Sequence, residues 1–124
     1  MKYINRYVVA VFLISFCTAC GGHKQDKDSG EANDVTQNEI LEGKNLIAKS
    51  DCMGCHKEDG KLVGPSYLEI ANYYEANKKN VEMLSVKIVK GGQGSWGNIP
   101  MAPHPTISEQ DARKMVEYIL SQKK

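Results

Sequence analysis

The sequence predicts an all-α fold for the part of the chain that can build a hydrophobic core. Apolar residues recur at spacings of three and four in several segments, which is the period of a helix with one buried face. Capping residues precede these segments, and glycines or prolines separate them. No stretch alternates between apolar and polar residues well enough to predict a β sheet.

The first two predicted helices flank a cysteine-containing motif. Thr36 and Glu39 form a capping box ahead of a one-sided apolar stripe, which predicts a helix from Thr36 to Ser50. The chain then turns near Gly64 and Pro65, and residues 67–74 can form a short helix.

Two further helices are predicted in the C-terminal half. Asn80 is the expected N-cap of a third helix that ends at Gly91. Ser108 and Asp111 cap the last helix, whose apolar residues repeat at three and four: Ala112, Met115, Val116, Ile119 and Leu120.

Residues 52–56 spell C-x-x-C-H, the most informative motif in the chain. Cys52 and Cys55 are spaced so that each thiol can add to one vinyl group of a single haem. His56, directly after them, is placed to ligate the iron from the same side. The motif predicts one covalently attached haem.

Two other uses of a C-x-x-C pair remain open at this point. A zinc site normally needs two more ligands, but Cys17 and Cys20 lie in the N-terminal segment, and His23 and His104 are isolated. A thioredoxin-like dithiol would follow a strand in a β-α-β unit, whereas here a predicted helix leads into the motif. Haem attachment is therefore favoured.

The N-terminal segment has the pattern of an export signal. Lys2 and Arg6 precede an apolar run that is too short for a transmembrane helix of about 20 residues. The run ends at small residues and Cys20, and this resembles the bacterial lipoprotein signal. The resemblance implies cleavage after residue 19 and a lipidated Cys20, although Cys17 stands where an aliphatic residue is usual. A plain secretory signal, or Cys17 and Cys20 as a second C-x-x-C pair, are the alternatives.

Removal of the signal leaves an anchor with a linker and one domain. Residues 20–36 are polar and are expected to form the lipidated anchor and a flexible tether, whose last 16 residues would span roughly 22 Å. Residues 37–124 make one domain, near the lower size limit for independent folding. Without Lys2 and Arg6, 14 of the 16 basic residues remain against 15 acidic ones, a net charge of −1. The absence of a basic stripe argues against a nucleic-acid partner.

The second axial position of the iron has two rival ligands. Met53 lies inside the attachment loop, and Met83 and Met115 lie in predicted helices, where packing explains them. Met101 and His104 both lie in the loop of residues 91–105, which is rich in glycine at its start and in proline at its end. Spacing alone leaves both of them open.

Three stretches give the chain its resemblance to the class I c-type cytochromes, in particular the small monohaem cytochromes of bacteria. They are residues 43–56, residues 63–68, and residues 94–101 with the closing helix. The resemblance covers nearly all of residues 37–124. It implies the cytochrome c fold, with three to five helices wrapped around one covalently attached haem.

The resemblance also implies roles for individual residues. His56 would be the proximal ligand, Met101 the distal ligand, and the Pro65 carbonyl the acceptor for the His56 imidazole. Trp96 would pack beside the haem and reach a propionate. Gly43 would allow the first and last helices to cross closely near Tyr118. Two departures from the family pattern are Ile47, where an aromatic is common, and Ala102, where proline usually follows the ligand.

A haem with two protein ligands has no open position for oxygen or peroxide, which favours electron transfer over catalysis. We expect a monomeric, membrane-tethered one-electron carrier of a respiratory chain, facing the periplasm. It would link a donor complex or dehydrogenase to a terminal oxidase or reductase through brief docking. The alternatives are a permanent subunit of a larger oxidoreductase, and a haem sensor or peroxidase-like protein with a labile distal ligand. The candidate docking charges are Lys57, Lys61, Lys87 and Lys90.

Overall fold

Residues 29–124 are described by the computed structural model, with side chains from residue 36 onward. The predicted signal sequence, Cys17, the predicted lipid anchor at Cys20 and His23 therefore lie outside the described residues. In the part that is described, no helix is both long enough and apolar enough to cross a membrane.

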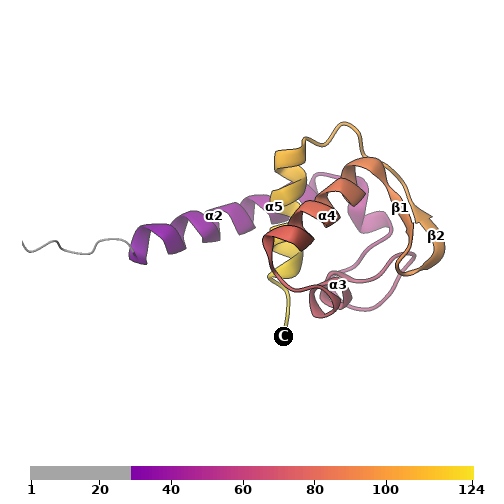
Figure 1. Cartoon of the computed structure of the whole chain (residues 1–124), viewed down its shortest axis with the longest axis horizontal. Helices are drawn as coiled ribbons and strands as arrows, with labels where there is room; N and C mark the ends of the chain where they lie inside the picture. Colours follow the sequence, from indigo (N-terminus) through magenta and orange to yellow (C-terminus); the bar gives the residue numbers. More distant parts are fainter. Residues whose placement is uncertain (1–28) are drawn as a thin grey trace, which may run out of the picture.

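The described chain is mostly helical, as predicted (Figure 1). Its elements in chain order are α2 (Ser29–Ala48), the short 3₁₀ helix η1 (Asp51–Gly54), α3 (Tyr67–Tyr73), α4 (Lys78–Lys90), β1 (Gly92–Gly94), β2 (Gly97–Met101) and α5 (Glu109–Leu120). The four α-helices confirm the predicted fold class.

The closing helix α5 organises the core. It packs against α2, α3 and α4, so its apolar face is surrounded by the other helices (Figure 1). Met115 and Val116 are almost inaccessible to solvent, and they pack in one cluster with buried residues of the other helices: Ile47, Tyr67 and Ile88. The apolar spacing of the last helix thus predicts its buried face correctly.

Helices α2 and α5 cross at Gly43. A Cβ atom at Gly43 would overlap the backbone carbonyl of Lys114 and would lie 3.1 Å from Cβ of Tyr118. Only glycine allows this approach, because any side chain would push the two backbones apart. The expected close crossing near Tyr118 is confirmed.

Local hydrogen bonds explain where α3 and α5 begin. Ser108 Oγ accepts from the backbone N–H of Asp111 at 3.1 Å, which confirms the predicted cap of α5. At α3, Ser66 Oγ accepts from the N–H of Glu69 at 3.1 Å, and the Glu69 carboxylate accepts from the N–H of Ser66 at 2.7 Å. This reciprocal capping box places α3 directly after Pro65.

Helix α4 begins earlier than predicted. Asn77, rather than Asn80, is its N-cap, because Asn77 Oδ1 accepts from the backbone N–H of Asn80 at 3.0 Å. The side chain of Asn80 instead donates to the carbonyl of Glu75 at 2.9 Å. Two asparagines three residues apart offer the same capping chemistry, and the chain uses the first.

Helix α2 also begins earlier than predicted, at Ser29 rather than after Thr36. Residues 29–36, which composition assigns to a flexible linker, are its first two turns. A polar composition predicts exposure, but exposure does not forbid a helix, since a helix satisfies most of its backbone hydrogen bonds internally. Figure 1 shows this end of α2 projecting away from the body of the domain.

A small β hairpin was not predicted. Strands β1 and β2 pair antiparallel, with Gly92 opposite Met101 and Gly94 opposite Gly97. Neither strand alternates between buried and exposed residues, since nearly all of their residues face solvent. The two-residue periodicity that reveals a half-buried strand is therefore absent from the sequence.

Candidate functional site

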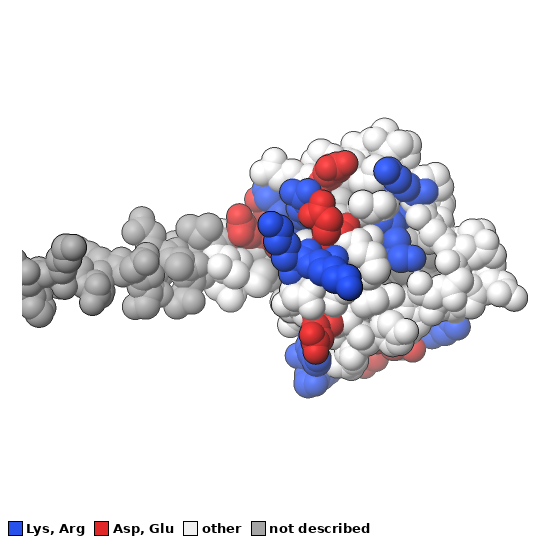
Figure 2. Space-filling model, viewed as in Figure 1, with Lys and Arg blue, Asp and Glu red and all other residues white. Residues whose placement is uncertain are grey.

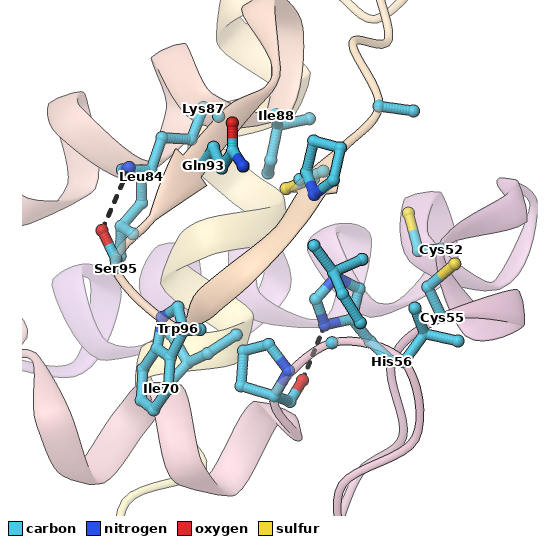
Figure 3. Close-up of a pocket in the computed structure, with 18 of the residues that line it drawn as sticks. Cys52, Cys55, His56, Ile70, Leu84, Lys87, Ile88, Gln93, Ser95 and Trp96 are labelled. Atoms are coloured by element: carbon cyan, nitrogen blue, oxygen red, sulfur yellow. Dashed lines mark hydrogen bonds between the residues drawn. The ribbon is translucent and has the colours of Figure 1, made fainter.

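One large cavity, of about 410 Å³, opens beside the C-x-x-C-H motif. The motif and the segment after it form one wall, and the β hairpin with the loop that follows forms another (Figure 3). Most of the exposed lining is apolar, and the apolar side chains of α3, α4 and α5 that contribute to it are Ile70, Leu84, Ile88, Met115, Val116 and Ile119. Such a volume and lining are typical of a site that binds a largely apolar group.

The tight backbone of η1 brings the three motif side chains together. The backbone N–H groups of Cys55 and His56 both donate to the carbonyl of Cys52, at 3.1 and 3.0 Å. Figure 3 shows Cys52, Cys55 and His56 at the same side of the cavity. Burial raises the pKa of the Cys52 thiol, and the neighbouring Asp51 carboxylate adds to the effect. Cys52 is half-buried and Cys55 is exposed, so both sulfurs lie at the edge of the cavity.

The imidazole of His56 is oriented by the segment that follows it. Its Nδ1 donates to the carbonyl of Pro65 at 2.6 Å. Because a carbonyl can only accept, Nδ1 carries the proton, and Nε2 of the neutral ring keeps a lone pair for a metal. The expected Pro65 contact is thus present in the described structure.

Gly64 supports the same ring from beside it. A Cβ at Gly64 would lie 2.5 Å from Cε1 and 2.9 Å from Nδ1 of His56, so only glycine leaves room for the imidazole. The backbone N–H of Gly64 also donates to the carbonyl of Cys55 at 2.9 Å, which fixes this segment against the motif. The sequence places Gly64 in a turn but does not reveal this contact.

Tyr67 is a site residue that the sequence did not single out. Its ring stacks on that of His56, with centroids 6.0 Å apart and planes at 17°. Burial raises the pKa of its phenol to about 12, so the hydroxyl stays protonated. The hydroxyl is buried and has no hydrogen-bond partner among the described residues, although the residue lines the cavity. A buried donor without a partner fits a site that a bound group completes.

Met101 lies at the end of β2 and lines the cavity from the hairpin side. Met101 pairs with Gly92 across the hairpin, and its partly buried side chain packs against the hydrophobic core. The cavity thus lies between a wall that carries His56 and a wall that carries Met101.

Trp96 occupies the turn of the hairpin and lines the cavity mouth (Figure 3). Its ring lies 5.0 Å from that of Tyr73 and 6.5 Å from that of Tyr74, measured between centroids. These contacts connect the hairpin to α3 and hold the hairpin over the cavity.

His104, the rival ligand in the sequence, also lines the cavity, but each of its ring nitrogens faces an oxygen of a neighbouring segment. Nε2 lies 3.1 Å from Oδ1 of Asp51, and Nδ1 lies 3.3 Å from the carbonyl oxygen of Ile88. The described geometry therefore favours Met101 over His104 as the residue available to a bound metal.

The residues present fit a haem. The cavity is largely apolar, two thiols lie at its edge, one imidazole nitrogen is available, and the Tyr67 hydroxyl has no hydrogen-bond partner within the described part of the chain. Among the described residues no group of three or more His, Cys, Asp and Glu side chains could hold a metal ion, so a zinc site at the motif finds no support there.

Comparison with known proteins identifies the family. The family model for cytochrome c matches residues 40–123. Cytochrome c-551 of Azotobacter vinelandii is 41% identical over 81 residues, which cover 65% of this chain and 98% of that protein. Cytochrome c-552 of Hydrogenobacter thermophilus is 40% identical over 76 residues, which cover 61% of this chain and 76% of that protein.

Solved structures agree with the sequence comparison. The crystal structure of wild-type cytochrome c552 from Nitrosomonas europaea superposes with a TM-score of 0.61 at 36% identity, and covers 64% of this chain and 99% of that one. The chain therefore belongs to the cytochrome c family: it is a class I monohaem c-type cytochrome, an electron-transfer protein rather than an enzyme, with one haem c bound covalently through Cys52 and Cys55.

Proposed function

We propose that this cytochrome is a membrane-tethered one-electron carrier in which His56 and Met101 are the axial ligands. It would accept an electron from a respiratory donor complex or dehydrogenase and pass it to a terminal oxidase or reductase. The observation that carries the proposal is one largely apolar cavity that is lined both by His56, whose Nδ1 is bonded to Pro65, and by Met101.

The haem supplies the redox chemistry, which is the gain and loss of one electron at iron. The chain sets the conditions for that step. The hydrogen bond from His56 Nδ1 to the Pro65 carbonyl fixes the ring and raises the basicity of Nε2. A thioether at Met101 on the other side favours the ferrous state relative to a second imidazole. The apolar lining disfavours the extra positive charge of the ferric state.

Electron exchange would take place where the cavity opens to solvent. Val63, Trp96 and Ile99 line the cavity and are exposed, with 43%, 36% and 66% of their surfaces accessible. Residues 91–108, which include the hairpin, contain no Asp, Glu, Lys or Arg. In Figure 2, charged side chains of both signs lie over the helices, whereas the side of the molecule formed by the hairpin is largely uncharged. An apolar edge of this kind suits brief docking to a redox partner.

Charged residues and Trp96 would complete the exchange site. Lys61 and Lys87 line the cavity and would, with Lys57 and Lys90, meet acidic groups of a partner. We assign Trp96 to the haem edge, where its indole N–H would donate to a propionate.

The location of the carrier follows from the N-terminal sequence. Removal of residues 1–19 and lipidation of Cys20 would leave the domain, residues 37–124, attached to a membrane on the periplasmic side. The carrier would act as a monomer.

Axial ligation is tested by the optical spectrum of the purified ferric protein. We expect the weak long-wavelength band of sulfur bound to ferric iron in the wild type and in Met83→Leu, where an exposed methionine of α4 is replaced. Met101→Leu should lack the band. A wild-type spectrum without it would overturn the assignment of Met101, and rapid binding of carbon monoxide to the ferrous protein would instead favour a labile distal ligand.

The tether is tested by mass spectrometry of protein extracted from membranes with detergent. The expected mass is that of residues 20–124 with one haem and a lipid on Cys20. A mature chain that begins elsewhere and carries no lipid would refute the anchor. Stoichiometric partners that remain bound after extraction would show a permanent subunit instead of a free carrier.

A further inference from the structure

His104 connects three segments that surround the cavity. Its ring contacts Asp51, the first residue of η1, and the carbonyl of Ile88 near the end of α4. His104 itself lies three residues after Met101, in the loop that leads to α5. The imidazole therefore joins the loop that follows Met101 and strand β2 to η1, which contains Cys52.

The chemistry of these contacts assigns the proton on one ring nitrogen. The Asp51 carboxylate can only accept a hydrogen bond, so Nε2 of His104, 3.1 Å from Oδ1, is the donor. Nδ1 is 3.3 Å from the Ile88 carbonyl, so a ring protonated at both nitrogens donates to both segments. A neutral ring protonated at Nε2 keeps the bond to Asp51 alone, so the bond to Asp51 is the one present in both states.

The contact between His104 and Asp51 matters because Asp51 lies next to a haem-binding cysteine. Asp51 immediately precedes Cys52, through which the haem is bound, so a bond from His104 to Asp51 fixes the loop directly after Met101 to the point of haem attachment. We propose that His104 is a positioning residue, whose bond to Asp51 holds Met101 against the iron and disfavours its replacement by another ligand. This inference rests on the proposed ligation by Met101.

The backbone allows the side-chain contact to be tested by itself. The N–H of His104 donates to the Ile88 carbonyl at 3.1 Å, and the N–H of Ile107 donates to the His104 carbonyl at 3.1 Å. His104→Ala keeps both of these bonds and removes only the imidazole. Asp51→Ala removes the partner at an exposed site, where 83% of the side chain is accessible, so this variant should fold normally.

The expected effect is modest, because the contact is partly exposed. The side chain of His104 is 19% accessible, so the pair is better shielded than a fully exposed ion pair but not fully buried. Pairs of this kind change an equilibrium by about two- to fivefold. An effect of that size is measurable as a change in the affinity of a competing ligand.

The experiment is an imidazole titration of the ferric haem protein, followed by the loss of the sulfur-to-iron band. Imidazole nitrogen would replace the Met101 sulfur as a ligand, with no change in oxidation state. We expect the dissociation constant of imidazole to fall about threefold in His104→Ala and in Asp51→Ala, and the double variant to show no further fall. Asp51→Asn keeps an acceptor for Nε2 and should recover most of the wild-type constant.

Asp59→Ala is the matched control, since Asp59 is an exposed acid near the motif whose described hydrogen bond is to the next residue, Gly60. Its imidazole constant should equal that of the wild type. Unfolding in denaturant, measured in parallel, separates a local effect on Met101 from a general loss of stability.

Two results would overturn the inference while leaving Met101 ligation intact. One is a set of unchanged imidazole constants, and the other is strictly additive effects in the double variant. A wild-type ferric protein that lacks the sulfur-to-iron band would instead refute Met101 ligation itself, so the two failures can be told apart.

Discussion

Gly64→Ala should disturb the imidazole of His56, because the added methyl group has no room beside the ring. The added Cβ would lie 2.5 Å from Cε1 and 2.9 Å from Nδ1 of His56, where ordinary contact requires 3.4 Å or more. The ring or the backbone must therefore move by roughly 1 Å, in a region fixed by the hydrogen bond from His56 to Pro65 at 2.6 Å.

Two magnitudes follow from this displacement. Overpacking of this kind costs about 1–3 kcal/mol of unfolding free energy, and each kcal/mol lowers Tm by about 4–8 °C in a domain of this size. With His56 as the proposed iron ligand, a longer bond to Pro65 would lower the basicity of Nε2 and so destabilise ferric iron, which would raise the reduction potential. A loss of about 0.5–1 kcal/mol from that bond corresponds to roughly 20–40 mV for one electron.

Gly54→Ala is the control for both measurements. Gly54 lies within the motif, between Cys52 and Cys55, but a Cβ there would meet nothing within 4 Å. Thermal unfolding followed by absorbance and potentiometric titration should show Gly54→Ala close to the wild type and Gly64→Ala shifted in both. A Gly64→Ala protein with the Tm and potential of the control would refute the packing argument.

Three further predictions concern the rest of the domain. Gly43→Ala should lower the free energy of unfolding by at least about 2 kcal/mol, although alanine favours a helix, because the added Cβ would overlap the Lys114 carbonyl. An unchanged midpoint of chemical denaturation would contradict the close crossing of α2 and α5. The N–H and the hydroxyl of Ser66 donate hydrogen bonds to the Glu69 carboxylate and lower its pKa below the usual 4.5. These bonds therefore stabilise the folded protein fully above pH 4.5, and the stabilisation is lost as the pH falls through the lowered pKa of the folded state. The stability difference between wild type and Glu69→Gln should therefore shrink on acidification, and a constant difference would contradict the capping box. Because burial raises the pKa of the Tyr67 phenol to about 12, Tyr67→Phe should remove an ionisation step near pH 12 from an absorbance titration of the folded protein, and loss of a step near pH 10 instead would contradict the burial of the phenol.

The sequence predicts those parts of the molecule whose cause is local or periodic. Ser108 caps α5 as expected, because an N-cap bond joins residues three apart. The apolar repeat from Ala112 to Leu120 predicts the buried face of that helix for the same reason. The motif at Cys52 and Cys55 identifies the cofactor because its chemistry requires that spacing.

Three features of the structure were not predicted, each for a different physical reason. The contact of His104 with Asp51 joins residues 53 positions apart, and no spacing rule connects them. The hairpin was missed because its strands have almost no buried face. The early start of α2 was missed because the polar composition of residues 29–36 indicates contact with solvent but does not determine the backbone conformation.

The projecting end of α2 changes how an N-terminal anchor would act on the domain. Residues 29–36 in a helix rise about 12 Å along one axis, and α2 is continuous with the segment that crosses α5 at Gly43. With an anchor at Cys20, this part of the attachment would be a helix of fixed length and not a flexible chain. Its length would add to the distance between the cavity and the bilayer, and so would help to set the height above the membrane at which a partner can dock.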